Sequence, residues 1–424
     1  MQRHFLKNGK ILDVKARKVL TGSSIFIEGS EIIRVGSVEE LGEIEKTLLS
    51  ETILDLDGRL IMPGLIDSHV HLCHIQGSEE IDTLTENLRA TDTLKVLHGA
   101  RNARETLESG FTTVRDVGQG DNLALREAIE RGIITGPRIV ACGWLGMAGG
   151  HQQRMTSEWR FGVRPRQEDL GVDGPWDVRR RVRKLVGQGV DCIKTYTSGS
   201  GGIRHPFYPY WLEYRNFTPE EMEALVDESH TAGRRVAAHT LVSNEGVKLA
   251  IWAGVDTLEH GVLIREEDAR EMQKKGIIYV PTLAVIRAMW DVKGQEKIKY
   301  LRISEEDALR YVEEHQASFQ RAHDCGVKIA MGSDTFRVLR HGGNACELKA
   351  MVEAGMSEME AIVSATKIAS EALGIESLLG TVEEGKLADL LVVDPNPLDD
   401  ISVLLKREHL KLIMKNGEVI VSRP

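Results

Sequence analysis

Short apolar runs alternate with longer, mostly amphipathic stretches between about residues 59 and 374. The runs are nearly continuous in apolar residues and rich in β-branched ones, which is typical of parallel strands covered on both faces. Seven runs lie at 111–114, 138–141, 190–193, 235–238, 255–258, 277–280 and 327–330, and an eighth, at 60–66, precedes them. The pattern predicts eight buried strands, each followed by a longer segment.

Glycines mark the places where a longer stretch ends and the next apolar run begins, because glycine adopts the left-handed conformation that often ends a helix. These glycines are Gly110, Gly132, Gly189, Gly233, Gly254, Gly276 and Gly326. One helix start is equally clear: Thr218 is a capping residue, Pro219 suits the first helical position and Glu221 completes a capping box. The alternation predicts an α/β fold, a (β/α)8 TIM barrel over residues 58–379. An open doubly wound sheet is the structural alternative.

The two ends of the chain do not follow this alternation. Residues 1–57 and 380–424 read as short strands separated by turns, and Asn8-Gly9 is echoed by Asn416-Gly417. Asn-Gly between apolar runs is a strong hairpin signal. We expect the two ends to meet as one small β-sandwich domain beside the barrel. The stretch 151–175 fits neither pattern and is interpreted as a long loop over the strand ends.

The composition argues against several classes of partner. The formal charge of −10 opposes binding to nucleic acid or to an anionic membrane surface. No uncharged apolar run is long enough to span a bilayer, and the first ten residues lack the core of a secretion signal. The five cysteines are odd in number and include no Cys-x-x-Cys pair, as expected of buried reduced thiols. We therefore expect a cytoplasmic protein, a homo-oligomer that binds a small-molecule substrate.

Candidate metal ligands fall where a barrel would place them, at the carboxyl ends of its strands. They are His69, His71, Lys194, His239, His260 and Asp334. A single barrel histidine is more often a hydrogen-bonded structural residue than a ligand. Six such residues after five strands, however, would all converge on the face where active sites of this fold lie. The set predicts a metal centre.

Lys194 is the unusual member of this set. A protonated amine has no lone pair and repels cations, so an ordinary lysine does not bind a metal. A lysine neutralised by its surroundings can instead react with carbon dioxide to form a carbamate, which is an anionic carboxylate on a long arm. The alternative is a metal-free ion pair between Lys194 and Asp334.

Several short motifs together resemble the amidohydrolase superfamily. They are Pro63-Gly64-Leu65-Ile66-Asp67-Ser68-His69-Val70-His71, Thr112-Thr113-Val114-Arg115-Asp116, Ile193-Lys194, Ala238-His239, Leu258-Glu259-His260-Gly261, Gly332-Ser333-Asp334 and the tail at 380–394. The similarity covers essentially the whole chain. It is strongest to the branch with bacterial prolidase-like and Xaa-Arg carboxypeptidase-like metallopeptidases and imidazolonepropionase-related proteins.

The resemblance implies a site with two divalent ions, for which zinc is the metal expected. His69, His71 and Asp334 would hold one ion and His239 and His260 the other, with a carbamate on Lys194 and a hydroxide between them. Asp334 would accept the proton of the water and pass it to the leaving nitrogen. The implied reaction is hydrolysis of an amide C–N bond in a small molecule, a dipeptide or an N-acyl amino acid.

Further residues are substrate-binding candidates. His151 is similar to a histidine that the family places near the scissile group, with an exposed loop histidine as the alternative. Tyr196 and Arg204 follow the fourth strand and are candidates for holding a carboxylate. The related peptidases often carry a tyrosine two residues after the histidine of the fifth strand, whereas Leu241 stands here. A less polar amide, carbamate or urea substrate would suit that position.

Neighbouring residues are interpreted as supporting the site, and three other functions stay open at this point. His74 is expected to be structural, and Arg115 and Asp116 are interpreted as a buried pair that supports the site. Carbamate, arylurea, phosphotriester or lactone hydrolysis uses the same two-metal chemistry. A mononuclear deaminase on this scaffold usually lacks the strand-four lysine, and a non-catalytic binding protein would not require the complete ligand set.

Overall fold

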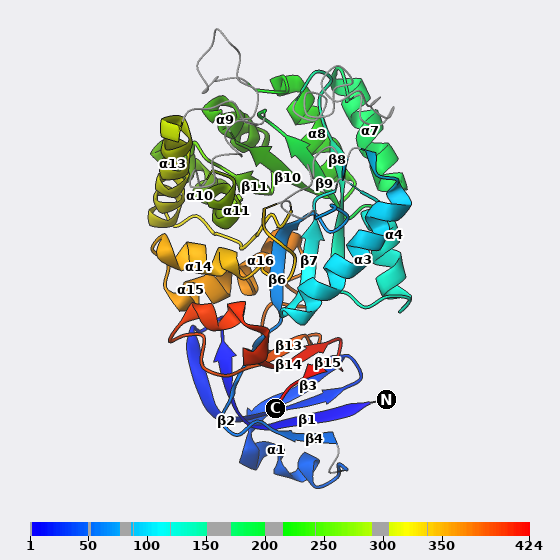
Figure 1. Cartoon of the computed structure of the whole chain (residues 1–424), viewed down its shortest axis with the longest axis vertical. Coiled ribbons are helices and arrows are strands. Elements are labelled where there is room, and N and C mark those ends of the chain that lie inside the picture. The colour runs from blue at the N-terminus through cyan, green and yellow to red at the C-terminus, as the bar shows by residue number, and fades with distance from the viewer. Residues whose placement is uncertain are drawn as a thin grey trace.

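The larger part of the chain is built on a parallel seven-stranded sheet with the order β12-β11-β10-β9-β8-β7-β6 (Figure 1). The computed structural model describes residues 2–49, 52–76, 86–87, 89–118, 120–150, 171–199, 215–241, 243–290, 305–336 and 338–424. The strands are β6 (Leu65–Val70), β7 (Phe111–Asp116), β8 (Arg138–Leu145), β9 (Cys192–Tyr196), β10 (Arg235–Thr240), β11 (Thr257–His260) and β12 (Ile278–Val280).

The segment after Val327 closes this sheet into a barrel. Ile329 pairs with Tyr279 of β12, and Thr335 pairs with Val70 of β6, both in parallel. The amide of Asp334 also donates to the carbonyl of His69 across 2.7 Å. The (β/α)8 prediction is therefore confirmed, although its eighth member pairs through isolated bridges rather than a continuous ladder.

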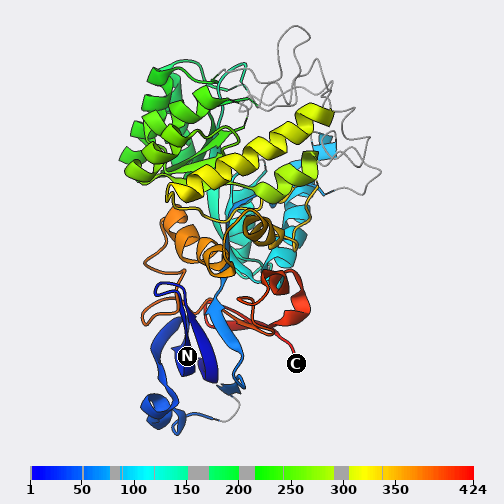
Figure 2. The same cartoon turned by 90° about the vertical axis from the view of Figure 1, so that its left-hand side faces the viewer.

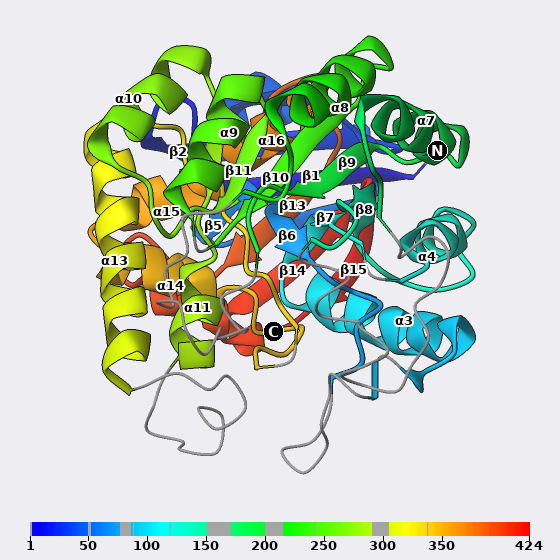
Figure 3. The same cartoon turned by 90° about the horizontal axis from the view of Figure 1, so that it is seen from above.

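Helices surround the barrel strands in the view from above (Figure 3). They are α3 (Asp92–Glu108), α4 (Asn122–Glu130), α7 (Pro175–Gly187), α8 (Pro219–Thr231), α9 (Asn244–Ala253), α10 (Glu266–Lys275), α11 (Leu283–Trp290), α13 (Glu305–Asp324), α14 (Cys346–Glu353), α15 (Glu358–Ser364) and α16 (Lys367–Leu373). The capping box predicted at Thr218 is present at the start of α8. Such a cap contributes about 1 kcal/mol. None of the described helices is both long and apolar enough to cross a membrane.

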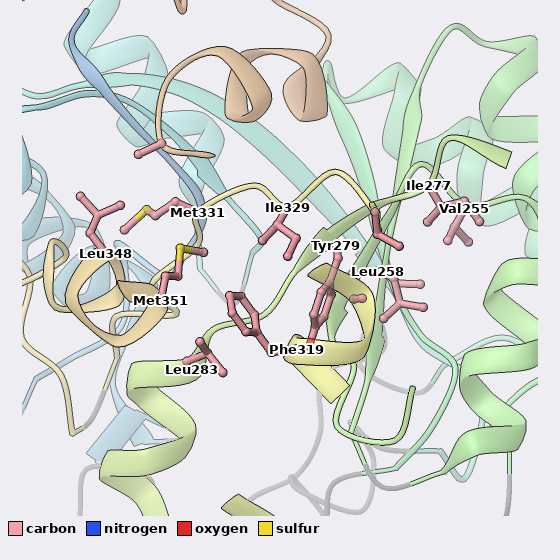
Figure 4. Close-up of a cluster of buried hydrophobic side chains, with 14 of the residues drawn as sticks. Val255, Leu258, Ile277, Tyr279, Leu283, Phe319, Ile329, Met331, Leu348 and Met351 are labelled. Carbon is pink, nitrogen blue, oxygen red and sulfur yellow. The ribbon is translucent and has the colours of Figure 1, made fainter. Parts of the chain in front are cut away.

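Strand residues alternate between the core under the helices and the inside of the barrel. Leu258 and Tyr279 pack with Phe319 of α13 in the main apolar core (Figure 4). Ile193 belongs to the same core, so period-two alternation places its neighbours Cys192 and Lys194 on the barrel interior. The interior positions near the carboxyl ends of the strands are thereby available for polar residues.

Both chain ends contribute to a second, mixed sheet with the order β15-β14-β13-β5-β1-β2-β3, and β4 also pairs with β1. Its strands are β1 (Arg3–Asp13), β2 (Lys18–Glu28), β3 (Glu31–Ser37), β4 (Ile53–Asp55), β5 (Leu60–Pro63), β13 (Leu390–Val393), β14 (Leu410–Lys415) and β15 (Glu418–Ser422). Helix α1 (Val38–Glu45) follows β3, and two 3-10 turns, Ile401–Leu405 and Arg407–His409, precede β14. The small terminal β domain is confirmed, and it lies below the barrel in two perpendicular views (Figures 1 and 2).

Two details of the sequence prediction are wrong. The run 60–66 is not one barrel strand: it divides at Gly64, and β5 pairs with β1 and β13 in the terminal sheet. A side chain at Gly64 would collide with Thr112, so the chain changes sheets where only glycine fits. Asn8-Gly9 is also not a hairpin, because β1 continues through it with a register shift at Gly9. The predicted hairpin at Asn416-Gly417 is confirmed, with φ of 49° and 75°.

Candidate metal centre

Three predicted ligands meet at the carboxyl end of β6. His69, His71 and Asp334 each offer one ligand atom, and these atoms lie within 4.8 Å of one another. Oδ1 of Asp334 is 3.3 Å from Nε2 of His71 and 3.6 Å from Nε2 of His69. All three side chains are buried. Two imidazoles and a carboxylate at this spacing can hold a divalent cation.

The other predicted ligands adjoin this group. The ring of His260 is 5.0 Å from that of His69 and 4.5 Å from that of His239, measured between centroids. Burial lowers the pKa of His69, and the nearby charge of Lys194 lowers it further. The structure therefore brings together all six residues that the sequence singled out as ligands.

Hydrogen bonds fix the orientation of three of the imidazoles. Nδ1 of His69 lies 2.5 Å from Oε2 of Glu259, and Nδ1 of His71 lies 2.9 Å from the carbonyl of Gly118. Nδ1 of His260 lies 2.8 Å from the hydroxyl of Thr282. With Nδ1 engaged, Nε2 is the nitrogen that faces the cluster, which is the usual arrangement around metal-binding histidines.

Left-handed backbone conformations direct two of the candidate ligands. His260 has a φ of 65° and Asp334 a φ of 50°. Because Glu259 faces the barrel interior, strand alternation would turn His260 outward, and the left-handed conformation returns it to the cluster. The carbonyl of His260 accepts from the hydroxyl of Tyr279 at 2.7 Å and from Nε2 of His315 at 2.8 Å. Strained backbone held by its surroundings is common at functional sites.

Lys194 is the decisive residue of the site. Its side chain is 1% exposed, and within the described residues its amine makes no hydrogen bond. Burial lowers the pKa of Lys194 to about 8; Glu259 opposes this shift and Arg115 reinforces it. A buried amine without a partner is costly unless it is modified or bound. A carbamate between two cations would meet this requirement, so the residues present fit such a group.

Comparison with known proteins agrees with this geometry. Residues 60–420 match the model of the amidohydrolase family. The chain belongs to this family. It is 31% identical to the ochratoxinase of Aspergillus niger over 94% of this chain and 83% of the relative. It is 23% identical to the imidazolonepropionase of Geobacillus kaustophilus over 95% of this chain and 91% of the relative.

Solved structures of the family give the same result. A Xaa-Pro dipeptidase with methionine bound in its active site superimposes with a TM-score of 0.84 at 33% identity, covering 98% of this chain and 99% of the dipeptidase. The structure of the A. niger ochratoxinase superimposes with a TM-score of 0.86 at 28% identity, covering 99% of this chain and 96% of the ochratoxinase. The protein is a hydrolase that acts on carbon–nitrogen bonds.

This amidohydrolase contains a buried ion pair next to the candidate ligands that the sequence analysis did not predict. Nη2 of Arg115 donates to Oε1 of Glu259 at 2.7 Å, and Nε donates to the carbonyl of Ser68 at 2.7 Å. Arg115 and Asp116 do not pair as expected: Asp116 accepts the amides of Leu72 and Gly118 instead. The signal for Glu259 was its place directly after the apolar Leu258, which packs in the core under the helices, since the next strand position then faces the barrel interior.

Replacing Arg115 by methionine is expected to destabilise the fold by about 3–5 kcal/mol, because it leaves the carboxylate of Glu259 buried without its cation. The midpoint of urea unfolding measures this change. Arg101→Met is the matched control, since its pair with Glu105 is exposed and contributes about 0–1 kcal/mol. Equal shifts for the two variants would contradict the proposed role of the pair.

A second buried carboxylate, that of Asp67 two residues before His69, also supports the candidate metal centre. Asp67 accepts from the amides of His69 and Ser333 at 3.1 and 2.9 Å, and from Nδ2 of Asn344 at 2.8 Å. Burial raises the pKa of Asp67 to about 6, and the hydrogen bonds lower the pKa and so oppose part of this shift. The group ties β6 to the segment that carries Asp334. Asn344 had no recognisable signal in the sequence.

The substrate-binding candidates have different outcomes. Tyr196 is buried, and its ring lies 5.2 Å from that of His239. His151 and Arg204 fall outside the residues that the structure describes. His74 is buried with Nδ1 3.3 Å from the carbonyl of Ile75, which agrees with a structural role. Leu241 directly follows β10 and is partly exposed.

Proposed function

We propose that this amidohydrolase uses two divalent metal ions to hydrolyse the amide bond of a dipeptide or an N-acyl amino acid. The observation that carries the proposal is the buried amine of Lys194, which lies among histidines and a carboxylate and makes no hydrogen bond in the described part of the chain. Neither a single-metal site nor a metal-free ion pair explains why an amine is placed there without a partner.

In this proposal His69, His71 and Asp334 would hold one cation, and His239 and His260 would hold the other. Lys194, converted to a carbamate, would offer an anionic carboxylate to the cations. Nitrogen and carboxylate ligands suit zinc, and manganese, cobalt and iron accept the same donors. Bound here, the cations would supply a nucleophile at neutral pH by lowering the pKa of a water molecule.

Asp334 is proposed to move the proton that the reaction requires. Burial opposes ionisation of its carboxyl, but the neighbouring His69 and His71 outweigh burial and hold the pKa of Asp334 below its ordinary value. The carboxyl is therefore ionised, which is the form that can accept a proton from the attacking water. An amide nitrogen leaves poorly unless it is protonated, so the same carboxylate would deliver that proton to it.

Three residues are proposed to bind the substrate. Tyr196 lies beside His239 and two positions after Lys194, so its hydroxyl is a candidate to contact a group at the cluster. His151 and Arg204 are proposed for the scissile group and for a substrate carboxylate. The similarity to a Xaa-Pro dipeptidase supports a substrate built on an amino acid.

A substrate screen tests this function. The purified chain, loaded with zinc in bicarbonate buffer, is assayed against dipeptides, N-acyl amino acids, carbamates and arylureas. We expect two zinc ions per chain, release of an amine from the first two classes, and loss of activity on chelation. Turnover of only carbamates or arylureas would replace the proposed substrate class. Ammonia release from a heterocycle by a chain with one ion would favour a deaminase.

A further inference from the structure

Apolar residues follow three of the ligands at the same spacing. Leu241 comes two residues after His239, and Val262 two residues after His260. Phe336 comes two residues after Asp334. All three belong to one apolar cluster, here called the mouth cluster, although their strands are separate. Its members are Leu241, Val262, Leu263, Val285, Ile286, Met289, Ala308, Tyr311, Val312, Phe336, Val338 and Leu339.

The mouth cluster has a buried base and a partly exposed rim. Val285, Ile286 and Tyr311 of α11 and α13 are at most 3% exposed. Leu241 and Phe336, by contrast, remain partly exposed where the chain leaves the barrel strands. The rim is therefore accessible at the end of the barrel that carries the metal ligands.

Phe336 connects the rim directly to the metal centre. Its ring is 5.5 Å from the ring of His71 and 5.5 Å from that of His74, edge-on to both. A substrate positioned for attack beside His71 would therefore extend past an aromatic side chain. Aromatic rings offer a large apolar contact area at little cost in conformational entropy.

We propose that the rim of the mouth cluster, chiefly Phe336 and Leu241, selects substrates with a branched or aromatic apolar group next to the scissile amide. This inference rests on the proposed function, whose substrate class it narrows. The occupant is apolar because Leu241 and Phe336, which follow two of the ligand strands, are partly exposed members of one apolar cluster. A charged group placed against this surface would lose its hydration without gaining a partner.

Matched substrate pairs test the selectivity on the zinc-loaded full chain. N-acetylphenylalanine is compared with N-acetylserine, and N-phenylacetylglycine with N-acetylglycine, so that the apolar group lies on either side of the amide. We expect the wild type to prefer the apolar member of at least one pair. Phe336→Ala should lower that preference, the ratio of the two kcat/KM values, by about 10- to 100-fold. Phe336→Leu should keep most of the wild-type preference, because leucine is also a large apolar side chain.

Two controls separate selectivity from folding and from chemistry. Leu309→Ala removes an exposed leucine of α13 that is not part of the mouth cluster and should leave the ratio unchanged. Zinc content, measured for every variant, should stay that of the wild type. A Phe336→Ala variant that loses activity on both members of a pair equally would assign Phe336 a purely structural role and overturn the proposal.

Product binding needs no turnover and so distinguishes the two proposals. Calorimetry compares phenylalanine with serine and phenylacetate with acetate, and Phe336→Ala should weaken the binding of the apolar product by about 10-fold. If no amide is hydrolysed but this pattern appears, the proposed function fails and the selectivity stands. If amides are hydrolysed but neither ratio nor binding responds to Phe336, the selectivity fails and the proposed function stands.

Discussion

Lys194→Ala is expected to lower kcat/KM by more than about 10³-fold and to reduce the zinc content from two ions per chain to one or fewer. Loss of a residue that merely orients a metal ligand already costs about 10- to 100-fold in affinity or activity. Lys194 is proposed to contact both cations, so its loss should exceed that range. Atomic absorption on dialysed protein and steady-state kinetics measure the two effects.

A carboxylate supplied from solution provides a sharper form of this test. Alanine leaves space where the long side chain of Lys194 lies buried, and a small carboxylate such as propionate should enter it and restore part of the activity. Lys248→Ala is the control, because Lys248 is an exposed residue of α9 paired with Glu245. A Lys194→Ala variant that keeps two ions and full activity would show that the amine has no part in the site.

Asp334→Asn should reduce kcat by about 10²- to 10⁴-fold, the range expected when a positioned proton carrier is lost. Asparagine keeps the size of the side chain and one oxygen but has no carboxylate to accept a proton. The defect should be smaller for p-nitroanilides than for alkyl amides, because their nitrogen leaves with less need of a proton. Parallel assays of the two substrate types measure this difference.

The matched control for Asp334 is Asp324→Asn, an exposed aspartate of α13 that should show no change in either substrate type. Zinc content distinguishes a lost ligand from a lost proton carrier. If Asp334→Asn binds both ions and slows both substrate types equally, the carboxylate does not protonate the leaving nitrogen. In that case another group must perform the transfer.

Local patterns in the sequence predict the barrel and its ligands for a physical reason. Buried parallel strands require continuous apolar runs, and the residue at the end of each run must then lie at one rim of the barrel. His69, Lys194 and His239 follow from this rule alone. The same rule would turn His260 away from the site, and only its left-handed backbone, which the sequence does not announce, returns it.

The features that sequence reasoning missed depend on contacts between distant segments. Glu259 is fixed by Arg115, 144 positions earlier, and Asn344 reaches Asp67 across 277 positions. The Asn8-Gly9 turn signal is overridden because β1 continues between its neighbours in the terminal sheet. Homo-oligomer formation and a cytoplasmic location stay predictions.

The chemical state of Lys194 is the point on which the whole account depends. Zinc-loaded protein prepared in ¹³C-bicarbonate should give a carbonyl carbon signal of one lysine carbamate per chain, absent from Lys194→Ala and lost when the metal is chelated. A fully active protein with two ions per chain and no such signal would contradict the account.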